Sequence, residues 1–270
     1  MKTEVDVFSM AEKIRETKPL VHHMTNWVTI YDCANITRAI GALPVMAHAP
    51  EEVEEMVGIS SALVLNIGTL TPELIETMKI AGKAANKKGI PIVLDAVGVG
   101  ATSLRTKSAL ELLEEISISV VKGNRGEIGT LSGAKAEVRG VEAGKVEGSL
   151  QEITMKLARE KDCVAAMTGK EDFVARPDGK GFVVKNGHEK MGSIVGTGCM
   201  SASVIGSFCA VEKDYAKAAA AGLSYFEIAG ELAARESKGP GTYKQAFYDE
   251  IYNLDKATVD RMQKVEEFTV

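Results

Sequence analysis

Short, continuous apolar runs that alternate with helix-like segments constrain the fold of this chain more than any other feature. The runs lie at residues 62–67, 90–94, 118–121 and 163–167. Strands that are apolar along their whole length are buried on both faces, and the segments between them are long enough for crossover helices. The pattern therefore predicts an α/β fold, with a mostly parallel central sheet and helices on both faces.

The segments between these runs carry the signals that begin and end helices. Thr71 is a capping residue, Pro72 follows at the first helical position, and a glycine ends the segment after residue 88. Asn124 and Glu127 have the spacing of a capping box, so another helix should follow residues 122–124, which we interpret as a turn. The other predicted helices span residues 103–115, 150–161, 199–211 and 216–235.

Two regions depart from the parallel pattern. Residues 172–176 and 181–185 flank the turn Pro177-Asp178-Gly179, which predicts an antiparallel hairpin at the edge of the sheet. The last roughly ninety residues look largely helical. Because no linker, low-complexity tract or repeat interrupts the chain, we expect residues 1–270 to form a single three-layer domain.

Composition excludes several classes of function. The formal net charge is -5 and there is no basic stripe, so we expect no nucleic-acid partner. No apolar run approaches the ~20 residues of a membrane helix, and the first ten residues do not resemble a secretory signal. The four cysteines are widely spaced, which argues against a zinc site or a disulfide framework. We therefore expect a cytoplasmic protein that does not bind membranes and keeps reduced thiols.

Candidate chemical groups lie where the predicted strands end. In open parallel sheets, ligands bind beyond the carboxyl ends of the strands. Asp95 and Glu127 lie near such ends and could hold a hydrated magnesium ion, whereas Lys122 and Thr168 could contact phosphate oxygens. Both carboxylates also have structural interpretations, Asp95 as a turn former and Glu127 as part of the capping box.

The strongest local motif is Gly196-Thr197-Gly198-Cys199, directly before a predicted helix. Glycines allow the backbone to approach a ligand closely, and a helix N-terminus offers free N–H groups and partial positive charge to an anionic phosphoryl group. The chain lacks a G-x-x-x-x-G-K-[ST] run, so it is not a P-loop nucleotidase. Taken alone, the motif could be a simple connection and Cys199 an inert small side chain.

Taken in order, these segments resemble the hydroxyethylthiazole kinase family of the ribokinase-like superfamily. The matching stretches lie at residues 19–29, 41–47, 49–52, 65–70, 94–100, 122–127 and 196–199. The resemblance covers roughly residues 11–254 and implies a ribokinase-like three-layer sandwich. It also implies that ATP, with Mg²⁺ as cofactor, phosphorylates the hydroxyl of 4-methyl-5-(2-hydroxyethyl)thiazole in thiamine salvage. A homotrimer with active sites between neighbouring subunits is implied as well.

The resemblance also implies roles for individual positions. Lys122 stands where many relatives have an arginine, and lysine lacks the planar fork with which arginine binds phosphate. The implied contacts are Asn26, Met46, Gly68 and Gly196 for the thiazole alcohol; Lys122 and Thr168 for ATP; Gly196, Thr197 and Gly198 for the transferred phosphoryl group; and Asp95 and Glu127 for magnesium and its waters.

Cys199 stands where most ribokinase-like kinases have an aspartate, which is taken as the base for the substrate hydroxyl. A free thiol has a pKa of ~8.5, and a helix N-terminus lowers it, so a thiolate could accept the proton. Phosphoryl transfer through a loose transition state needs little base strength, however. Our hypothesis is that Cys199 orients the hydroxyl and assists the reaction only modestly.

Three other functions remain open at this stage. A kinase for hydroxymethylpyrimidine or pyridoxal would share the glycine turn but lack the stretches at residues 19–29 and 41–47. An ATP-dependent dehydratase of hydrated nicotinamide cofactors would carry an aspartate at the turn. A non-catalytic ligand sensor would keep the pocket without the chemistry, although intact Asp95, Glu127 and Gly198 argue against it.

Overall fold

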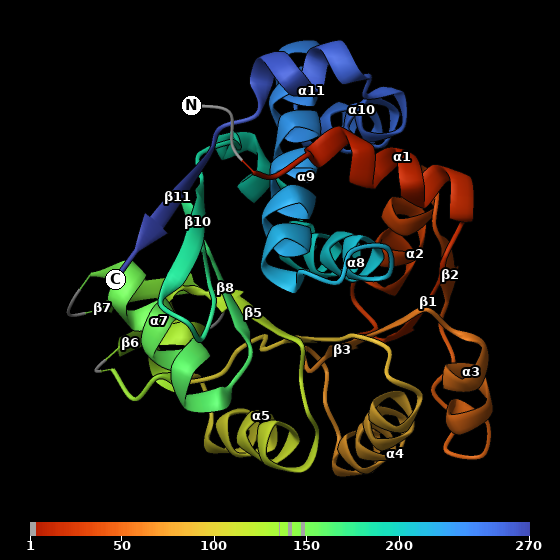
Figure 1. Cartoon of the computed structure of the whole chain (residues 1–270), viewed down its shortest axis with the longest axis vertical. Coiled ribbons are helices and arrows are strands. Elements are labelled where there is room, and N and C mark those ends of the chain that lie inside the picture. The colour runs from red at the N-terminus through yellow and green to blue at the C-terminus, as the bar shows by residue number, and fades with distance from the viewer. Residues whose placement is uncertain (1–3, 135, 140–141, 147–148) are drawn as a thin grey trace.

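A nine-stranded sheet runs through the centre of the molecule in the computed structural model, which describes residues 4–134, 136–139, 142–146 and 149–270 (Figure 1). The strand order is β11-β10-β9-β8-β5-β4-β3-β1-β2, and every pair from β2 to β8 is parallel. The strands are β1 (Leu20–Met24), β2 (Leu43–Val45), β3 (Ala62–Asn66), β4 (Ile92–Asp95), β5 (Val120–Asn124), β8 (Val164–Thr168), β9 (Asp172–Ala175), β10 (Lys180–Val184) and β11 (Val265–Thr269).

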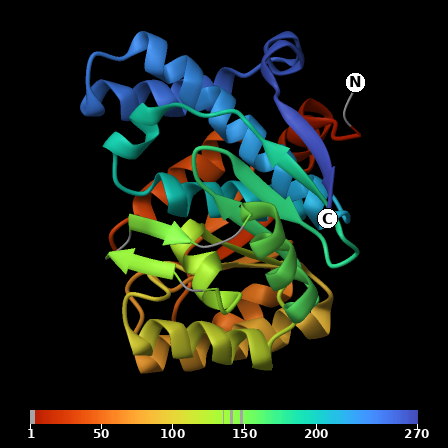
Figure 2. The ribbon, with the colours of Figure 1, turned by 90° about the vertical axis from the view of Figure 1, so that its left-hand side faces the viewer.

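Helices cover both faces of the sheet, which confirms the predicted α/β sandwich (Figures 1 and 2). One layer consists of α1 (Val7–Thr17), α2 (Ile30–Ala39), α8 (Thr197–Cys209), α9 (Tyr215–Glu236), α10 (Pro240–Asn253) and α11 (Lys256–Met262). The other consists of α3 (Val53–Ile59), α4 (Pro72–Lys88), α5 (Ser103–Glu115), α6 (Arg125–Leu131) and α7 (Leu150–Lys161). Among the described residues, every helix is too short or too polar to cross a lipid bilayer.

Successive residues of each central strand pack into opposite layers. Val64 belongs to the core beneath α8, whereas its neighbours Leu63 and Leu65 belong to the core beneath α4. This alternation follows from the period of two of a β-strand, and it explains why these strands are apolar along their whole length.

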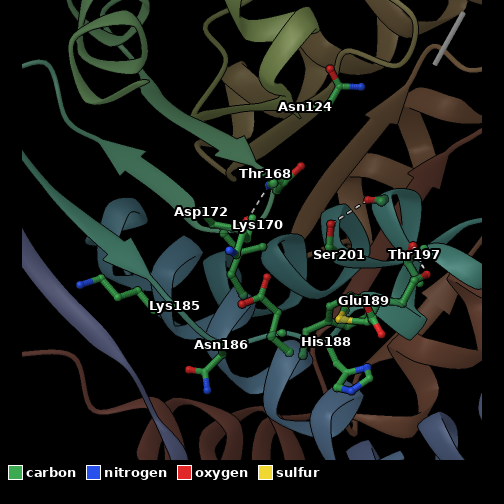
Figure 3. Close-up of a pocket in the computed structure, with 18 residues that line it drawn as sticks. Asn124, Thr168, Lys170, Asp172, Lys185, Asn186, His188, Glu189, Thr197 and Ser201 are labelled. Atoms are coloured by element: carbon green, nitrogen blue, oxygen red, sulfur yellow. Dashed lines mark hydrogen bonds between the residues drawn. The ribbon is translucent and has the colours of Figure 1, made fainter. Parts of the chain in front are cut away.

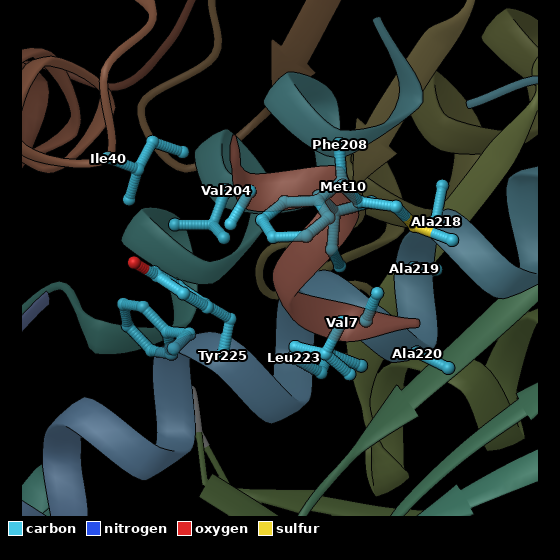
Figure 4. Packing of buried hydrophobic residues seen from close by; sticks show 14 of the residues in the cluster. Val7, Met10, Ile40, Val204, Phe208, Ala218, Ala219, Ala220, Leu223 and Tyr225 are labelled. Carbon is cyan, nitrogen blue, oxygen red and sulfur yellow. The ribbon is translucent and has the colours of Figure 1, made fainter. Parts of the chain in front are cut away.

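Helix α8 lies directly on the sheet and carries the glycine motif at its start. At Gly206 an added Cβ would lie 2.5 Å from Val64 Cγ2, so only a glycine permits this approach. On its other side α8 packs against the alanine-rich α9, where Phe208 and Tyr225 are in ring contact (Figure 4). This packing fixes the position of the first turn of α8 relative to the strand ends.

The predicted helices agree closely with the structure where local signals define their ends. Helix α4 begins after Thr71, whose side chain accepts a hydrogen bond from Leu74 N, and ends at the left-handed Gly89. The capping box of Asn124 and Glu127 is present at the start of α6. Helices α5 and α7 have the predicted bounds.

Two predicted boundaries and the predicted place of the hairpin in the sheet were wrong. Residues 122–124 extend β5 rather than forming a turn, because β4 and β8 pair with this segment on its two sides. The hairpin of β9 and β10 is not at the sheet edge, because β11 pairs with β10 (Figure 2). Helix α8 begins at Thr197 rather than residue 199, which places Gly198 inside its first turn. A separate hairpin of β6 (Ala136–Arg139) and β7 (Glu142–Val146) precedes α7.

Candidate active site

Three polar residues form a row at the carboxyl ends of adjacent strands. Asn66 is in register with Asp95, and Asp95 with Lys122, across β3, β4 and β5. Each lies two residues after an apolar residue that packs beneath α8, and alternate residues of a strand point to the same face. The row therefore faces that helix. The strand register therefore brings these three side chains together at the first turn of α8.

Lys122 forms a buried ion pair and ties the row to α8. Its Nζ lies 3.2 Å from Asp95 Oδ1 and donates a hydrogen bond of 2.8 Å to the carbonyl of Gly198. The Lys122 side chain is 4% exposed and that of Asp95 is fully buried. Lys122 thus holds the glycine motif in place from behind, and it does not project freely towards a ligand.

An asparagine pair completes the network on the other side. Asn66 Nδ2 donates to Asp95 Oδ2 at 2.6 Å, and Asn66 Oδ1 accepts from Asn26 Nδ2 at 3.0 Å and from Gly68 N at 2.9 Å. Asn26 Nδ2 also lies 3.3 Å from Cys199 Sγ. Because Cys199 follows Gly198, the hydrogen bonds form a closed ring from Lys122 through Asp95, Asn66 and Asn26 back to the start of α8.

The start of α8 has the conformation that the glycine motif requires. Gly196 caps the helix with a φ of 101°, and an added Cβ would lie 2.8 Å from Thr29 Cγ2. The first turn of a helix leaves N–H groups without intrahelical partners, and these groups carry partial positive charge. Cys199 lies in this first turn and is half-buried, so its thiol is beside the amides that could bind an anion.

Burial dominates the electrostatics of the network. Burial and the charge of Asp95 raise the pKa of the Cys199 thiol, which is opposite to the lowering that we expected from the helix N-terminus. Burial also raises the pKa of Asp95, although the Lys122 charge opposes the shift. Despite its own burial, Lys122 has a raised pKa because of the charges of Asp95 and Glu127. Lys122 is therefore a permanent cation, and Cys199 stays a thiol near neutral pH.

The two carboxylates predicted to organise magnesium have their oxygens engaged by the protein. Glu127 Oε1 accepts from Gly98 N at 2.7 Å and Oε2 accepts from Asn124 N at 2.6 Å, while both Asp95 oxygens are used in the network. In the described ranges no three His, Cys, Asp or Glu side chains gather as a metal-binding group. The two groups thus fit a role in holding metal-bound water better than direct ligation.

A cavity of about 730 Å³ opens beside the first turn of α8 (Figure 3). The ends of β5 and β8, the segment from Lys185 to Gly192, the first turn of α8 and one face of α9 line it. Thr168, Thr197 and Gly198 are among the lining residues. The cavity therefore meets the hydrogen-bonded ring at Gly198, so that a ligand in the cavity reaches the glycine motif.

Most of the predicted site residues fall into two groups. Asn26, Gly68, Asp95, Lys122 and Cys199 share the ring, and Thr168, Thr197 and Gly198 line the cavity. Gly198 joins the two groups because its carbonyl also accepts from Lys122, whereas Gly196 lies against Thr29. Glu127 is linked to both groups through the charge of Lys122. Met46 lies outside both, after β2.

Met46 is connected to the ring by a path through the imidazole of His48. Its carbonyl lies 3.3 Å from His48 Nδ1, and His48 Nε2 accepts from the amide of Thr25, which precedes Asn26. The imidazole of His48 also lies against the indole of Trp27. These contacts fix the loop after β2 beside the loop after β1.

Sequence reasoning missed two residues that organise the site. Asn66 is the centre of the asparagine pair, and its position at the end of an apolar run is the signal that could have identified it. Arg105 had no such signal, because it lies within α5. Its guanidinium donates to the carbonyls of Ile67 and Val97 at 2.9 Å and of Gly68 at 2.7 Å, and so joins the loops that follow β3 and β4.

Comparisons with known proteins identify the family of this chain. The model of the hydroxyethylthiazole kinase family matches residues 11–257. A hydroxyethylthiazole kinase of Methanosarcina mazei is 60% identical over 94% of this chain and 97% of its own length. The solved structure of a hydroxyethylthiazole kinase protein from Pyrococcus horikoshii has a TM-score of 0.88 and 40% identity, and the match covers 97% of this chain and 98% of that one.

A more distant structure shares the fold alone. An ADP/ATP-dependent NAD(P)H-hydrate dehydratase from Bacillus subtilis has a TM-score of 0.55 and 13% identity, covering 89% of this chain and 96% of that one. The family match and the high identity over nearly the whole length lead to one conclusion: this chain belongs to the hydroxyethylthiazole kinase family.

Proposed function

We propose that this protein is a hydroxyethylthiazole kinase of thiamine salvage, which transfers the γ-phosphoryl group of ATP to the hydroxyl of 4-methyl-5-(2-hydroxyethyl)thiazole. The observation that carries the proposal is the closed hydrogen-bonded ring, which places Cys199, Asn26 and Gly68 at one side of the α8 N-terminus while the large cavity opens at the other. An acceptor and a donor would therefore meet at this turn.

On the acceptor side, Cys199 positions the hydroxyl. A thiol whose pKa is raised by burial holds its proton near neutral pH, so it is a poor general base. Its sulfur is oriented by Asn26 Nδ2 and can contact the substrate hydroxyl as a weak hydrogen-bond partner. The hydroxyl oxygen then forms a bond to the γ-phosphorus while the bond to the bridging oxygen of ADP breaks. ADP leaves with the electron pair of the broken P–O bond, and the hydroxyl proton passes to solvent water as the new bond forms.

On the donor side, the cavity accommodates ATP with its phosphates towards α8. The free amides of the Gly196-Thr197-Gly198 turn stabilise charge on the transferred group, and Thr168 binds the phosphate chain from the end of β8. Lys122 contributes its charge from behind this turn, because its ammonium group is occupied by Asp95 and by the Gly198 carbonyl.

Magnesium is the cofactor that this reaction uses when bound with ATP, and it neutralises charge on the phosphate oxygens. Each carboxylate oxygen of Asp95 and Glu127 has a second lone pair besides the one that its protein donor uses. We propose that Asp95 and Glu127 would hold the metal through water, where it would neutralise charge on the phosphate oxygens.

Exposed apolar side chains beside the site support an interface between subunits, in keeping with the homotrimer that the family resemblance implies. Trp27, Val28 and Tyr31 flank Thr29 along the chain, and Val195 precedes Gly196, which lies against Thr29; each of the four is more than half exposed. Large apolar side chains gathered at one place on a surface are typical of an interface. We propose that a neighbouring subunit covers this patch, and that Met46 borders the thiazole in a pocket completed between the two subunits. We also propose that the enzyme acts in the cytoplasm.

The test is an ADP-release assay with three alcohols: the thiazole alcohol, hydroxymethylpyrimidine and pyridoxal, each with magnesium and ATP. We expect turnover of the thiazole alcohol alone, and equal turnover of either other alcohol would contradict the assignment. For the role of Cys199, Cys199→Asp should retain or raise kcat, and Cys199→Ala should lower it modestly. A loss of several thousandfold in Cys199→Ala would refute a positioning role.

A further inference from the structure

Two buried carboxyl groups face the cavity from different elements. Asp172 begins β9 and is 2% exposed, and Glu227 lies in the middle of α9 and is 7% exposed. Both line the cavity, and Asp172 is labelled in Figure 3. Burying a carboxyl group is unfavourable unless it is hydrogen-bonded or paired with a cation, so the presence of two in a cavity wall requires an explanation.

The two carboxyl groups are incompletely satisfied by the protein. Asp172 Oδ1 accepts from Gly169 N at 2.9 Å. Asp172 Oδ2 and Glu227 Oε2 have no donor from the described part of the chain. Burial raises the pKa of both groups, that of Asp172 to about 6, and their side chains are within hydrogen-bond reach of each other. One shared proton therefore joins them into an acceptor pair that carries a single negative charge.

The pair lies against the apolar part of the cavity wall. Leu223 and Phe226 precede Glu227 on α9, and Met191 lines the same cavity. An anionic pair is unfavourable beside phosphates, whereas apolar walls with a few polar acceptors suit a nucleoside. The phosphates have a better position at the first turn of α8, where N–H groups are free.

Glu227 is 7% exposed with its Oε2 buried, and the backbone beside its carboxyl group carries no side chain. Gly187 has a φ of 111°, and an added Cβ would lie 3.5 Å from Glu227 Cδ. Glu231 holds this loop, since its Oε1 accepts from Gly187 N and from Asn186 Nδ2, both at 3.0 Å. A rigid loop without a side chain at this position keeps the approach to the carboxyl group open.

We propose that Asp172 and Glu227 together recognise the nucleoside part of the phosphate donor by accepting hydrogen bonds from it. The donor groups are the ribose hydroxyls or the amino group of an adenine base. This inference rests on the proposed kinase function, because it assigns a role within the same cavity. It makes the pair a determinant of donor specificity that does not touch the transferred phosphoryl group.

The first experiment uses the unmodified protein. The KM is measured for ATP and three analogues. 2′-Deoxy-ATP and 3′-deoxy-ATP each lack one ribose hydroxyl, and ITP lacks the amino group of the base. Loss of a hydrogen bond to a charged group should raise KM about tenfold or more for at least one analogue. The analogue affected identifies the group that the pair binds. If all four nucleotides had KM values within about twofold, the proposal would be overturned.

The second experiment changes the pair and measures ADP binding by calorimetry, which does not depend on phosphoryl transfer. Glu227→Gln and Asp172→Asn should each weaken ADP binding about tenfold and reduce the preference among analogues. Glu236→Gln, an exposed change on the same helix, is the matched control and should behave like the unmodified protein. Unchanged ADP affinity in both folded variants would refute the role of the pair. Because binding is measured directly, a failure to phosphorylate the thiazole alcohol would count against the proposed function alone.

Discussion

Replacing Lys122 with methionine should destabilise the protein by about 3–5 kcal/mol, because the change leaves Asp95 buried without its cation. The Asp95 side chain is fully buried and that of Lys122 is 4% exposed, with 3.2 Å between Nζ and Oδ1. Methionine keeps most of the length and apolar volume of lysine, so the loss of charge accounts for most of the effect. For a chain of this size the midpoint of thermal unfolding should fall by roughly 6–20 °C.

Urea and thermal unfolding of a small set of variants measure this effect. Adding Asp95→Asn to Lys122→Met removes the stranded charge and should recover a large part of the loss, which a double-mutant cycle quantifies. Lys83→Met removes a lysine that is 59% exposed and pairs with Glu115, so it is the matched control and should cost no more than about 1 kcal/mol. The loss in Lys122→Met should be larger at pH 8 than at pH 5.5, because Asp95 can escape by taking up a proton at the lower pH.

Two outcomes would refute the reasoning. A loss below about 1 kcal/mol in Lys122→Met would mean that the ion pair contributes no more than an exposed one. A double variant that is no more stable than Lys122→Met would mean that the stranded carboxylate is not the cause. Lys122→Arg keeps the charge and should retain most of the stability, in keeping with the arginine that many relatives are implied to carry.

Three further predictions concern other parts of the network and fold. Burial raises the pKa of Glu127 from 4.5 to about 7, so its contribution to the free energy of unfolding should decrease as pH rises through that range, and Glu127→Gln should abolish this slope in denaturant titrations. Gly206→Ala should cost about 1–3 kcal/mol because its Cβ would meet Val64, whereas Gly58→Ala, with open space around it, should stabilise α3 by about 0.5–1 kcal/mol; thermal unfolding compares the two. Arg105→Lys removes the planar fork whose two nitrogens bind carbonyls of both loops, because lysine offers a single nitrogen. It should raise KM for the thiazole alcohol more than it lowers kcat in steady-state assays, and an unchanged KM would contradict the role of Arg105 in holding the loop of Gly68.

The layers of the fold and the starts of two helices could be predicted from the sequence alone, because they depend on residues close together in the chain. The alternation of apolar runs and helices predicted the layers, and the caps at Thr71 and Asn124 predicted where α4 and α6 begin. These predictions succeed because helix caps and strand burial patterns depend on hydrogen bonds and periodicities within a few residues. Most of the site residues were predicted from the family resemblance. The resemblance indicates which residues belong to the site but not which atoms they contact.

The contacts and pKa shifts of those residues depend on the tertiary structure and could not be predicted from the sequence. The row of Asn66, Asp95 and Lys122 exists because three strands pair in one register, and no local pattern in the sequence specifies that register. The same pairing explains why residues 122–124 extend a strand and why β11 covers the predicted edge. The thiol of Cys199 shows the difference most clearly. Its place at a helix N-terminus could be read from the sequence and predicts a lowered pKa, but burial beside Asp95 raises it, because the cost of removing a charge from water depends on groups brought from distant parts of the chain.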